Sequence, residues 1–369
     1  MTLPPGALRS GGWLRGSGHV LRLAVAAVLI AILAACGQSE GDSIAAVALP
    51  TTSPPATVAP NPTGTAPPTT TPTQAPVATP VPSPTIPAPV TVTVTMTDSV
   101  GREVELPGGR LERIISLAPS ATEILFAIGA GDRLVGIDDF SNYPAETADI
   151  PKLGSFSPDL ERIVALEPDL VVGSTITSHE VIEQIESLGI PVLIVGSLDV
   201  RGVADSIILL SEAVGEEETA QALAAELLDR IDAVVVAVAG TERPRIFYEV
   251  DASDPNRPFT IGPGFFVDDL ITLAGAENVF ADADSPFPQV GLEAVIARDP
   301  ELIILADAPF GTTVESVKAR AGWDGIDAVV NDRFMAISQE LSDQMSRPGP
   351  RIADALEAIA MFLHPEAFE

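Results

Sequence analysis

Residues 216–239 read EEETAQALAAELLDRIDAVVVAVA, and the rest of the chain is arranged around this run. Apolar residues recur in it at steps of three and four, which is the period of one buried helical face. They are Ala220, Leu223, Ala224, Leu227, Ile231, Val235 and Val238. An acidic first turn suits the positive end of a helix dipole. The pattern predicts a helix roughly 36 Å long, enough to run along a whole small domain.

Two similar phrases flank this helix. LERIVALEPDLVV begins at Leu160 and LEAVIARDPELII begins at Leu292, and they match position by position. A second pair precedes them, EILFAIGAGD from Glu123 and DLITLAGAE from Asp269. We therefore expect two similar α/β lobes, residues 91–213 and 241–369, joined by a helix within residues 214–240.

Short apolar strands alternate with helical segments in both lobes. Examples are the runs starting at Arg113, Leu134 and Asp169 before the long helix, and at Arg245 and Leu302 after it. This alternation favours a doubly wound parallel sheet in each lobe. Alternating residues from Thr91 to Leu106, broken by a turn at Asp98 to Gly101, predict a β-hairpin. Ser120 and Glu123 have the spacing of a helix capping box.

Composition excludes several classes of function. The formal net charge of −31 argues against nucleic acid, because a basic surface is what neutralises phosphates. A single cysteine permits neither an intramolecular disulfide nor a thiolate metal cluster. Downstream of that cysteine the chain has only two histidines, His179 and His364, and it has none of the usual hydrolase or phosphate-loop motifs. We expect no enzyme, no catalytic residue, no metal and no cofactor.

The N-terminus has the pattern of an exported lipoprotein. Three arginines precede an apolar run from Leu23 to Ala35 that is too short to span a membrane, so residues 1–35 are expected to be a signal peptide. The run ends in Leu33-Ala34-Ala35-Cys36, which resembles a bacterial lipobox, and Cys36 is the expected lipidation site. The rest of residues 36–90 is rich in Pro and Thr and predicts a disordered tether. The protein is then expected on the extracytoplasmic face of the cell membrane.

Aromatic residues in loops after strands are the best candidates for a ligand site. Phe140, Phe156 and Phe287 have this placement, and Phe259 borders a glycine-rich turn at residues 260–264. Ligands of open α/β sheets collect at the carboxyl ends of the strands, where such loops lie. Any one phenylalanine more commonly packs beneath its own loop. Several at equivalent strand ends in both lobes favour an apolar cleft between the lobes.

These motifs together resemble a known family. RIISLAPSATEIL from Arg113, NYP from Asn142, the phrase from Leu160 and SRPGPRI from Ser346 are similar to class III periplasmic binding proteins. These are the solute-binding proteins of ABC importers for vitamin B12 and ferric siderophores. The resemblance covers the chain from about Thr91 to its end. It implies two α/β lobes, one connecting helix, a ligand held between the lobes and little hinge motion.

The resemblance also implies roles for individual residues. Family members dock onto arginines of the membrane permease through one glutamate per lobe, and Glu161 and Glu293 occupy the matching positions. Each glutamate is also a favourable first-turn acid of a helix, and both interpretations can hold. Arg347 aligns with a position in the cleft and is a candidate ligand-binding residue, and Arg257 is the other candidate cation. B12-binding members carry mostly Tyr or Trp where this chain has Phe140, Phe156 and Phe287.

The leading interpretation is a monomeric lipoprotein that captures a cobalamin-like ligand and delivers it to an ABC permease and its ATPase. A cleft rich in Phe and poor in Arg favours a large, weakly charged ligand, whereas anionic siderophores call for arginines. A ferric siderophore or haem ligand is the alternative within this class. Two alternatives come from other classes. A metal-cluster enzyme of related fold would need several Cys or His ligands, and the predicted lobes have only two histidines and no cysteine. A sensor domain using the same cleft would need a partner chain to pass on the signal.

Overall fold

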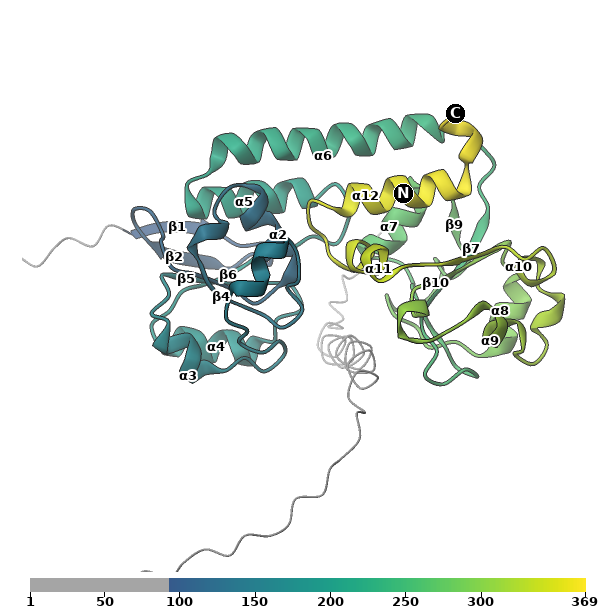
Figure 1. The fold of residues 1–369 in the computed structure, drawn as a ribbon, viewed down its shortest axis with the longest axis horizontal. Coiled ribbons are helices and arrows are strands. Elements are labelled where there is room, and N and C mark those ends of the chain that lie inside the picture. The colour runs from purple at the N-terminus through teal and green to yellow at the C-terminus, as the bar shows by residue number, and fades with distance from the viewer. Residues whose placement is uncertain (1–92) are drawn as a thin grey trace, which may run out of the picture. The chain divides into compact units, whose positions relative to one another are not determined.

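The computed structural model describes residues 93–369, and these residues form two α/β lobes (Figure 1). The predicted signal peptide, the lipidation site Cys36 and the tether lie outside the described residues. Within residues 93–369, no helix combines the length and the apolar character that a membrane span needs.

The chain first forms the predicted hairpin. Strands β1 (Thr93–Thr97) and β2 (Glu103–Pro107) pair antiparallel. Asp98 shapes the turn between them, since its Oδ1 accepts from the backbone N–H of Val100 at 3.1 Å and of Arg102 at 2.8 Å. One face of β2 is buried against the first lobe.

The first lobe contains a four-stranded parallel sheet in the order β4-β3-β5-β6. Its strands are β3 (Ile114–Ser116), β4 (Leu134–Ile137), β5 (Leu170–Gly173) and β6 (Val192–Ile194). Helices α2 (Pro119–Ala127), α3 (Leu160–Ala165), α4 (His179–Ser187) and α5 (Val203–Val214) cover it. The strands are short continuous apolar runs because both faces of a parallel sheet are buried.

The second lobe repeats this topology. Parallel strands β7 (Arg245–Asp251), β9 (Glu277–Asn278), β10 (Leu302–Leu305) and β11 (Phe334–Ala336) follow the order β9-β7-β10-β11. Strand β8 (Phe259–Thr260) is an addition that pairs antiparallel with the end of β7. In each lobe the first strand is central and the second lies at its edge, so the two sheets correspond strand by strand. The fold class that the repeated phrases predict is confirmed.

The remaining elements complete the two lobes. The helices of the second lobe are α7 (Phe266–Leu273), α8 (Leu292–Arg298), α9 (Val314–Lys318), α10 (Asp327–Val330), α11 (Gln339–Ser346) and α12 (Ile352–Leu363). Single 3₁₀ turns are η1 (Gly131–Arg133), η2 (Ala145–Asp149), η3 (Ala308–Phe310), η4 (Trp323–Gly325) and η5 (Pro365–Ala367).

The repeat extends to individual hydrogen bonds. Arg113, just before β3, donates from Nε to the carbonyl of Leu166 at 2.8 Å. Arg245, which begins β7, donates from Nη1 to the carbonyl of Arg298 at 2.6 Å. Leu166 and Arg298 hold the same position in the two repeated phrases. Each arginine thus satisfies carbonyls at the end of a short helix, where a helix leaves them without partners.

The ends of these phrases also match. Glu167 and Asp299 adopt positive φ angles of 45° and 44°, and this conformation lets the backbone reverse direction after α3 and after α8. Two residues later, Asp169 accepts from the backbone N–H of the strand-leading arginine at 3.0 Å, and Glu301 does so at 2.7 Å. Both repeated phrases thus contain an acid-Pro-acid motif, residues 167–169 and 299–301. In each lobe this motif connects the short helix to the first strand of the sheet through hydrogen bonds.

Helix α6 (Glu217–Ala237) joins the lobes and lies over α5 and α12, as Figure 1 shows. It is the helix that the apolar period predicts, shorter by one residue at its start and two at its end. The period predicted Val235 on the buried face, but Val234 is buried and Val235 is half-buried. The buried face shifts along α6 because α5 and α12 cover different parts of this helix. Arg230 fastens α6 to α12 through Glu357 at 2.8 Å and Asp354 at 2.6 Å.

Three apolar clusters make up the core. One cluster extends under α6 through both lobes and includes α2, α5, α7 and α12. The other two lie on the opposite face of each sheet, one beneath α4 and one beneath α8 and α10. Neighbouring residues of a strand point to opposite faces, so Ile114 joins the shared cluster while Ile115 joins the second. A core that continues from lobe to lobe opposes large hinge motion.

Candidate functional site

The structure brings two of the predicted ligand residues together in the first lobe. Phe140 follows β4, and Phe156 lies on the loop that leads to α3. Their ring centroids are 6.2 Å apart at an interplanar angle of 58°, a tilted aromatic pair. Phe140 is half-buried and Phe156 is 38% exposed, so the pair leaves apolar surface accessible.

A buried chain of hydrogen bonds fixes the Phe140 loop. Asp138 is 1% exposed, and its Oδ1 accepts from the N–H of Phe140 at 2.8 Å. The Ser141 hydroxyl donates to the other oxygen of Asp138 and shares a 2.8 Å hydrogen bond with Thr122 of α2. Burial raises the pKa of Asp138, and these hydrogen bonds oppose that rise. These hydrogen bonds therefore fix the backbone conformation of the Phe140 loop.

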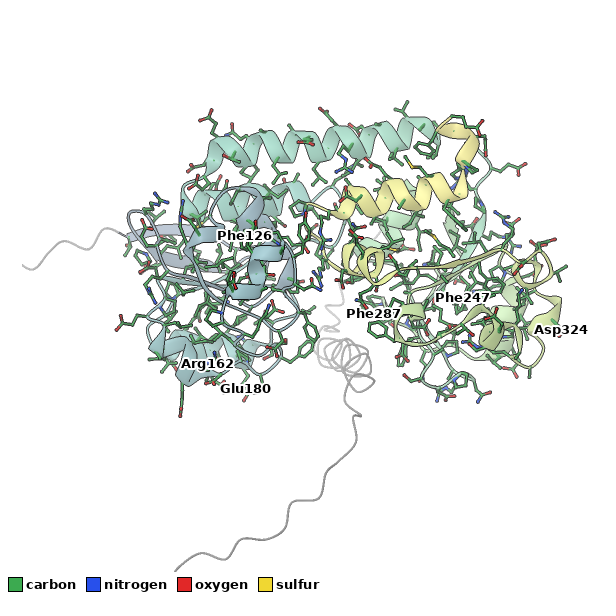
Figure 2. All side chains as sticks on the ribbon, in the orientation of Figure 1. Phe126, Arg162, Glu180, Phe247, Phe287 and Asp324 are labelled. Atoms are coloured by element: carbon green, nitrogen blue, oxygen red, sulfur yellow. The ribbon has the colours of Figure 1, made fainter. Side chains whose placement is uncertain are left out.

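The second lobe has its own aromatic cluster on the corresponding loop. Phe287, which Figure 2 labels, lies between β9 and α8. Its ring packs on that of Phe265, with ring centroids 4.7 Å apart and an interplanar angle of 64°. Phe265 in turn lies 4.3 Å from Phe266, centroid to centroid, at the start of α7. Phe259 lies on β8, which runs antiparallel to the Phe287 segment through a bridge to Gln289. Phe259 and Phe287 are both half-buried.

One guanidinium connects the two lobes. Arg347, between α11 and α12, is 8% exposed. Its Nη1 donates to Glu123 of α2 at 3.1 Å and to Asn142 Oδ1 at 2.7 Å. Its Nη2 donates to the carbonyl oxygen of Phe140 at 3.2 Å and lies 3.1 Å from Asp343. Both terminal nitrogens of Arg347 are thus occupied by groups of this chain, four contacts that the sequence did not predict.

A second arginine reinforces this junction. Arg351 donates to Glu123 from Nε at 2.9 Å and from Nη2 at 2.6 Å. Its guanidinium carbon lies 3.8 Å from the centroid of the Tyr143 ring, a cation–π contact. Asn142 also donates to Asp343 at 3.0 Å. We call Glu123, Asn142, Asp343, Arg347 and Arg351 the interlobe network.

The interlobe network corrects one prediction. Helix α2 begins at Pro119, and its N-cap residue Ala118 makes no side-chain cap. The predicted capping box of Ser120 and Glu123 is therefore wrong, because two guanidinium groups bind the Glu123 carboxylate. Sequence showed only a weak signal of this pairing: an acid within an otherwise apolar helix, and two arginines near a Pro-Gly-Pro turn more than two hundred residues away.

The two predicted docking residues occupy equivalent places. Glu161 lies in the first turn of α3 and Glu293 in the first turn of α8, and both are exposed. The structure gives neither of them an ion-pair partner among the described residues. Among residues 93–369, both carboxylates are therefore exposed and without an ion pair. Arg257, the other candidate cation, lies on an exposed loop before β8.

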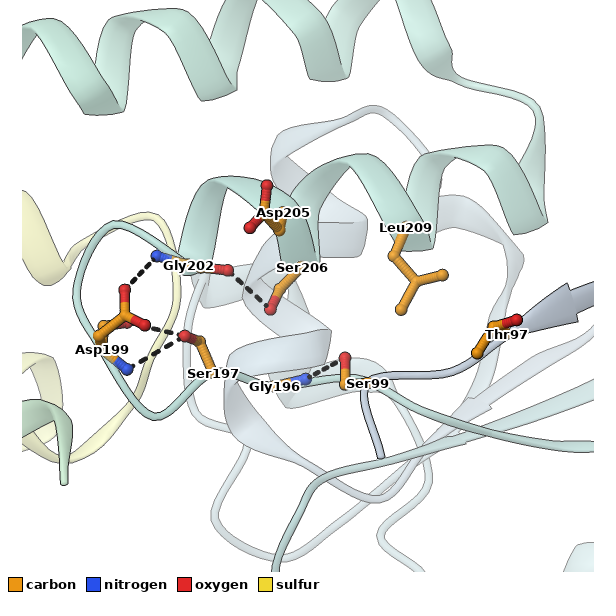
Figure 3. Close-up of a pocket in the computed structure, with 9 residues that line it drawn as sticks. All are labelled: Thr97, Ser99, Gly196, Ser197, Asp199, Gly202, Asp205, Ser206 and Leu209. Atoms are coloured by element: carbon orange, nitrogen blue, oxygen red, sulfur yellow. Dashed lines mark hydrogen bonds between the residues drawn. The ribbon is translucent and has the colours of Figure 1, made fainter. Parts of the chain in front are cut away.

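A separate polar pocket of about 380 Å³ lies in the first lobe (Figure 3). It is bounded by Thr97 of β1, the loop at residues 196–199 and the first turns of α5. Polar groups that line the pocket hydrogen-bond to each other. Asp199 accepts from the N–H of Gly202 at 2.7 Å, and Ser206 donates to the carbonyl of Gly202 at 3.3 Å. None of the predicted ligand residues lines this pocket.

Comparison with known proteins agrees with this geometry. The model of the family described as periplasmic binding protein matches residues 114–341. The uncharacterized ABC transporter substrate-binding lipoprotein YvrC of Bacillus subtilis is 30% identical over 75% of this chain and 87% of its own length.

Two solved structures share the fold. The periplasmic vitamin B12 binding protein BtuF of Vibrio cholerae superposes with a TM-score of 0.59 at 28% identity, over 70% of this chain and 98% of that one. The periplasmic heme-binding protein RhuT of Roseiflexus sp. RS-1 gives 0.62 at 27% identity, over 70% and 100%. These relatives are binding proteins and not enzymes. The chain belongs to the periplasmic binding protein family, whose members bind solutes outside the cytoplasm for ABC importers.

Proposed function

We propose that this protein is a lipid-anchored solute-binding protein that captures a cobalamin-like ligand between its lobes and delivers it to an ABC permease and its ATPase. Apolar aromatic clusters on corresponding loops of the two lobes support this proposal most directly. Phe140, Phe156, Phe259 and Phe287 would contact the ligand. A corrin ring is large, and its peripheral methyl and amide groups carry no charge, so flat aromatic side chains can pack against it.

The state of Arg347 also favours a weakly charged ligand. Its terminal nitrogens already bind Glu123, Asn142, the carbonyl oxygen of Phe140 and Asp343. Redirecting this guanidinium to a ligand carboxylate would leave Glu123 with one fewer partner in a buried place, which is costly. Arg347 would therefore touch a ligand mainly through the Phe140 loop that it holds.

Haem is the second candidate, and one observation favours it. Tyr143 is 45% exposed, follows closely on Phe140 and lies under the Arg351 guanidinium. A phenolate is an established haem ligand, and the exposed ring of Tyr143 could reach a haem. Absorption spectra separate the two ligands: a Soret band that Tyr143→Phe removes would assign haem, and corrinoid bands that survive this replacement would assign cobalamin.

The delivery step would use Glu161 and Glu293, with Cys36 as the lipid anchor and residues 36–90 as the tether. The test is uptake by cells carrying Glu161→Ala together with Glu293→Ala. We expect uptake to be lost while ligand affinity stays unchanged, because both residues are exposed in the first turns of α3 and α8 and are not among the proposed ligand contacts. Loss of ligand affinity in this double variant would contradict the docking assignment.

A further inference from the structure

Helices α3 and α8 repeat more than an acid. Three residues after Glu161 lies Val164, which is 44% exposed, and three residues after Glu293 lies Ile296, which is 36% exposed. Residues at this spacing share one face of a helix. The following alanine of each helix is exposed as well. Each lobe therefore presents the same set of acid, branched apolar residue and alanine, in the same order.

Exposed apolar residues are common singly and need no explanation. Here the exposure recurs at one repeat position in both lobes, next to the free carboxylate. The buried positions between them, Ile163 and Val295, supply the packing of these helices, so neither Val164 nor Ile296 is needed to fill the core. The repeated exposure points to a contact with another molecule.

Energetics give a reason for the apolar residues. An exposed ion pair contributes only about 0–1 kcal/mol, since solvent screens it. Two isolated carboxylates would then hold a partner weakly. Apolar side chains beside each carboxylate can exclude water from the pair and add their own burial, which is how strong contacts at interfaces are built.

We propose that Val164 and Ile296, together with Glu161 and Glu293, form two equivalent docking patches for one partner, the transmembrane permease. This inference rests on the proposed function. The partner must offer the same complementary patch twice, a cation flanked by an apolar side chain, because the two patches of this chain are alike. A two-fold permease dimer meets that requirement, and its cations complement the acids of this strongly negative chain.

The experiment measures binding of the whole protein to the permease–ATPase complex of the source cell, reconstituted in nanodiscs. Val164→Ala with Ile296→Ala should weaken binding about tenfold, mainly through faster dissociation. Glu161→Ala with Glu293→Ala should instead slow association and reduce its dependence on salt. Each single apolar variant should account for a similar share of the loss.

The matched control is Val236→Ala with Val330→Ala, since these valines are 73% and 65% exposed and lie outside both patches. It should leave binding unchanged. Thermal unfolding midpoints are compared for all variants, because shortening Ile296 could also change stability. The Ile296 side chain lies beside Gly322, where an added Cβ would be 3.1 Å from it.

The outcomes are distinguishable. If the apolar variant binds like the control while the acid variant is weakened, the inference is overturned and the proposed docking by Glu161 and Glu293 stands. If only one of the two apolar positions matters, the two patches are not equivalent and the inference also fails. If the acid variant binds normally as well, the docking step of the proposed function is wrong.

Discussion

Arg347 donates to Glu123 at 3.1 Å across 224 positions of sequence, and this buried ion pair connects the second lobe to helix α2 of the first. The same guanidinium donates to the carbonyl oxygen of Phe140. Arg347, which we propose to lie at the ligand site, therefore connects the two lobes and holds the backbone of Phe140.

Replacing Arg347 should cost stability. Removing one partner from a buried ion pair typically costs about 3–5 kcal/mol, because the other charge stays buried. Since Glu123 keeps Arg351, we expect Arg347→Ala to lower the free energy of unfolding by about 2–3 kcal/mol in urea titrations. Ligand affinity should fall too, as the Phe140 loop loses its support.

Arg110→Ala is the matched control. Arg110 pairs with Glu112 at 3.2 Å, but both side chains are about 60% exposed. Exposed pairs contribute little, so this variant should lie within about 0.5 kcal/mol of the wild type. Equal losses for the two variants would contradict a special role for the interlobe network.

The aromatic loops should carry ligand affinity from both lobes. We expect Phe140→Ala and Phe287→Ala each to weaken ligand binding by about tenfold or more, as each removes a large apolar contact. The control is Phe362→Ala, which changes a phenylalanine that is 44% exposed on α12. Titration of each variant with the assigned ligand measures the effect, and an unchanged affinity in Phe287→Ala would remove the second lobe from the site.

Asp307 makes the stability of the second lobe depend on pH. It follows β10, is 5% exposed, and accepts from Thr312 at 2.8 Å and from the N–H of Ala252 at 3.0 Å. Burial, together with the nearby charge of Glu249, raises the pKa of Asp307 to about 6. The folded protein therefore keeps a proton on this carboxyl in a pH range where the unfolded chain has lost it.

The sign follows from linkage. Between about pH 4 and pH 6 the folded state binds more protons, so the free energy of unfolding falls as the pH rises. A shift of about two units corresponds to on the order of 3 kcal/mol. Asp307→Asn should remove this dependence and be more stable than the wild type at pH 7.5 but not at pH 4. Parallel pH profiles of the two proteins would disprove this origin.

We propose Cys36 as the lipid anchor, so replacing it should release the protein from the membrane. Cys36→Ser should move the protein from the membrane fraction to the soluble fraction, since a serine offers no thiol for lipidation. Fractionation followed by immunoblotting measures this. Continued membrane association at high salt would require another anchor.

The two-lobed fold was predictable because its signals are local and occur twice. The Leu160 and Leu292 phrases each encode a helix, a reversal and a strand, and the period from Ala220 to Val238 marks the connecting helix. Strand β8 was missed, since two residues bordered by a glycine-rich turn carry no detectable period. Helix α6 begins one residue later and ends two residues earlier than predicted, because the sequence carries no strong signal at either end of it.

The site was only partly predictable. Phe140 and Phe156 were expected at the ligand site because each lies on a loop after a strand, but their pairing with each other was not predicted. The partners of Arg347 were not, since an ion pair over such a separation depends on tertiary packing that no local pattern encodes. Exposure of Val164 and Ile296 was equally hidden, because an apolar residue in an amphipathic helix is normally assigned to the core.

Calorimetric titration of the folded part, residues 91–369, with cyanocobalamin tests the proposed function most directly. We predict one-to-one binding at micromolar affinity or tighter, accompanied by a shift of the visible corrinoid bands. An absence of both heat and band shift, with haemin or a ferric siderophore binding instead, would contradict the cobalamin assignment.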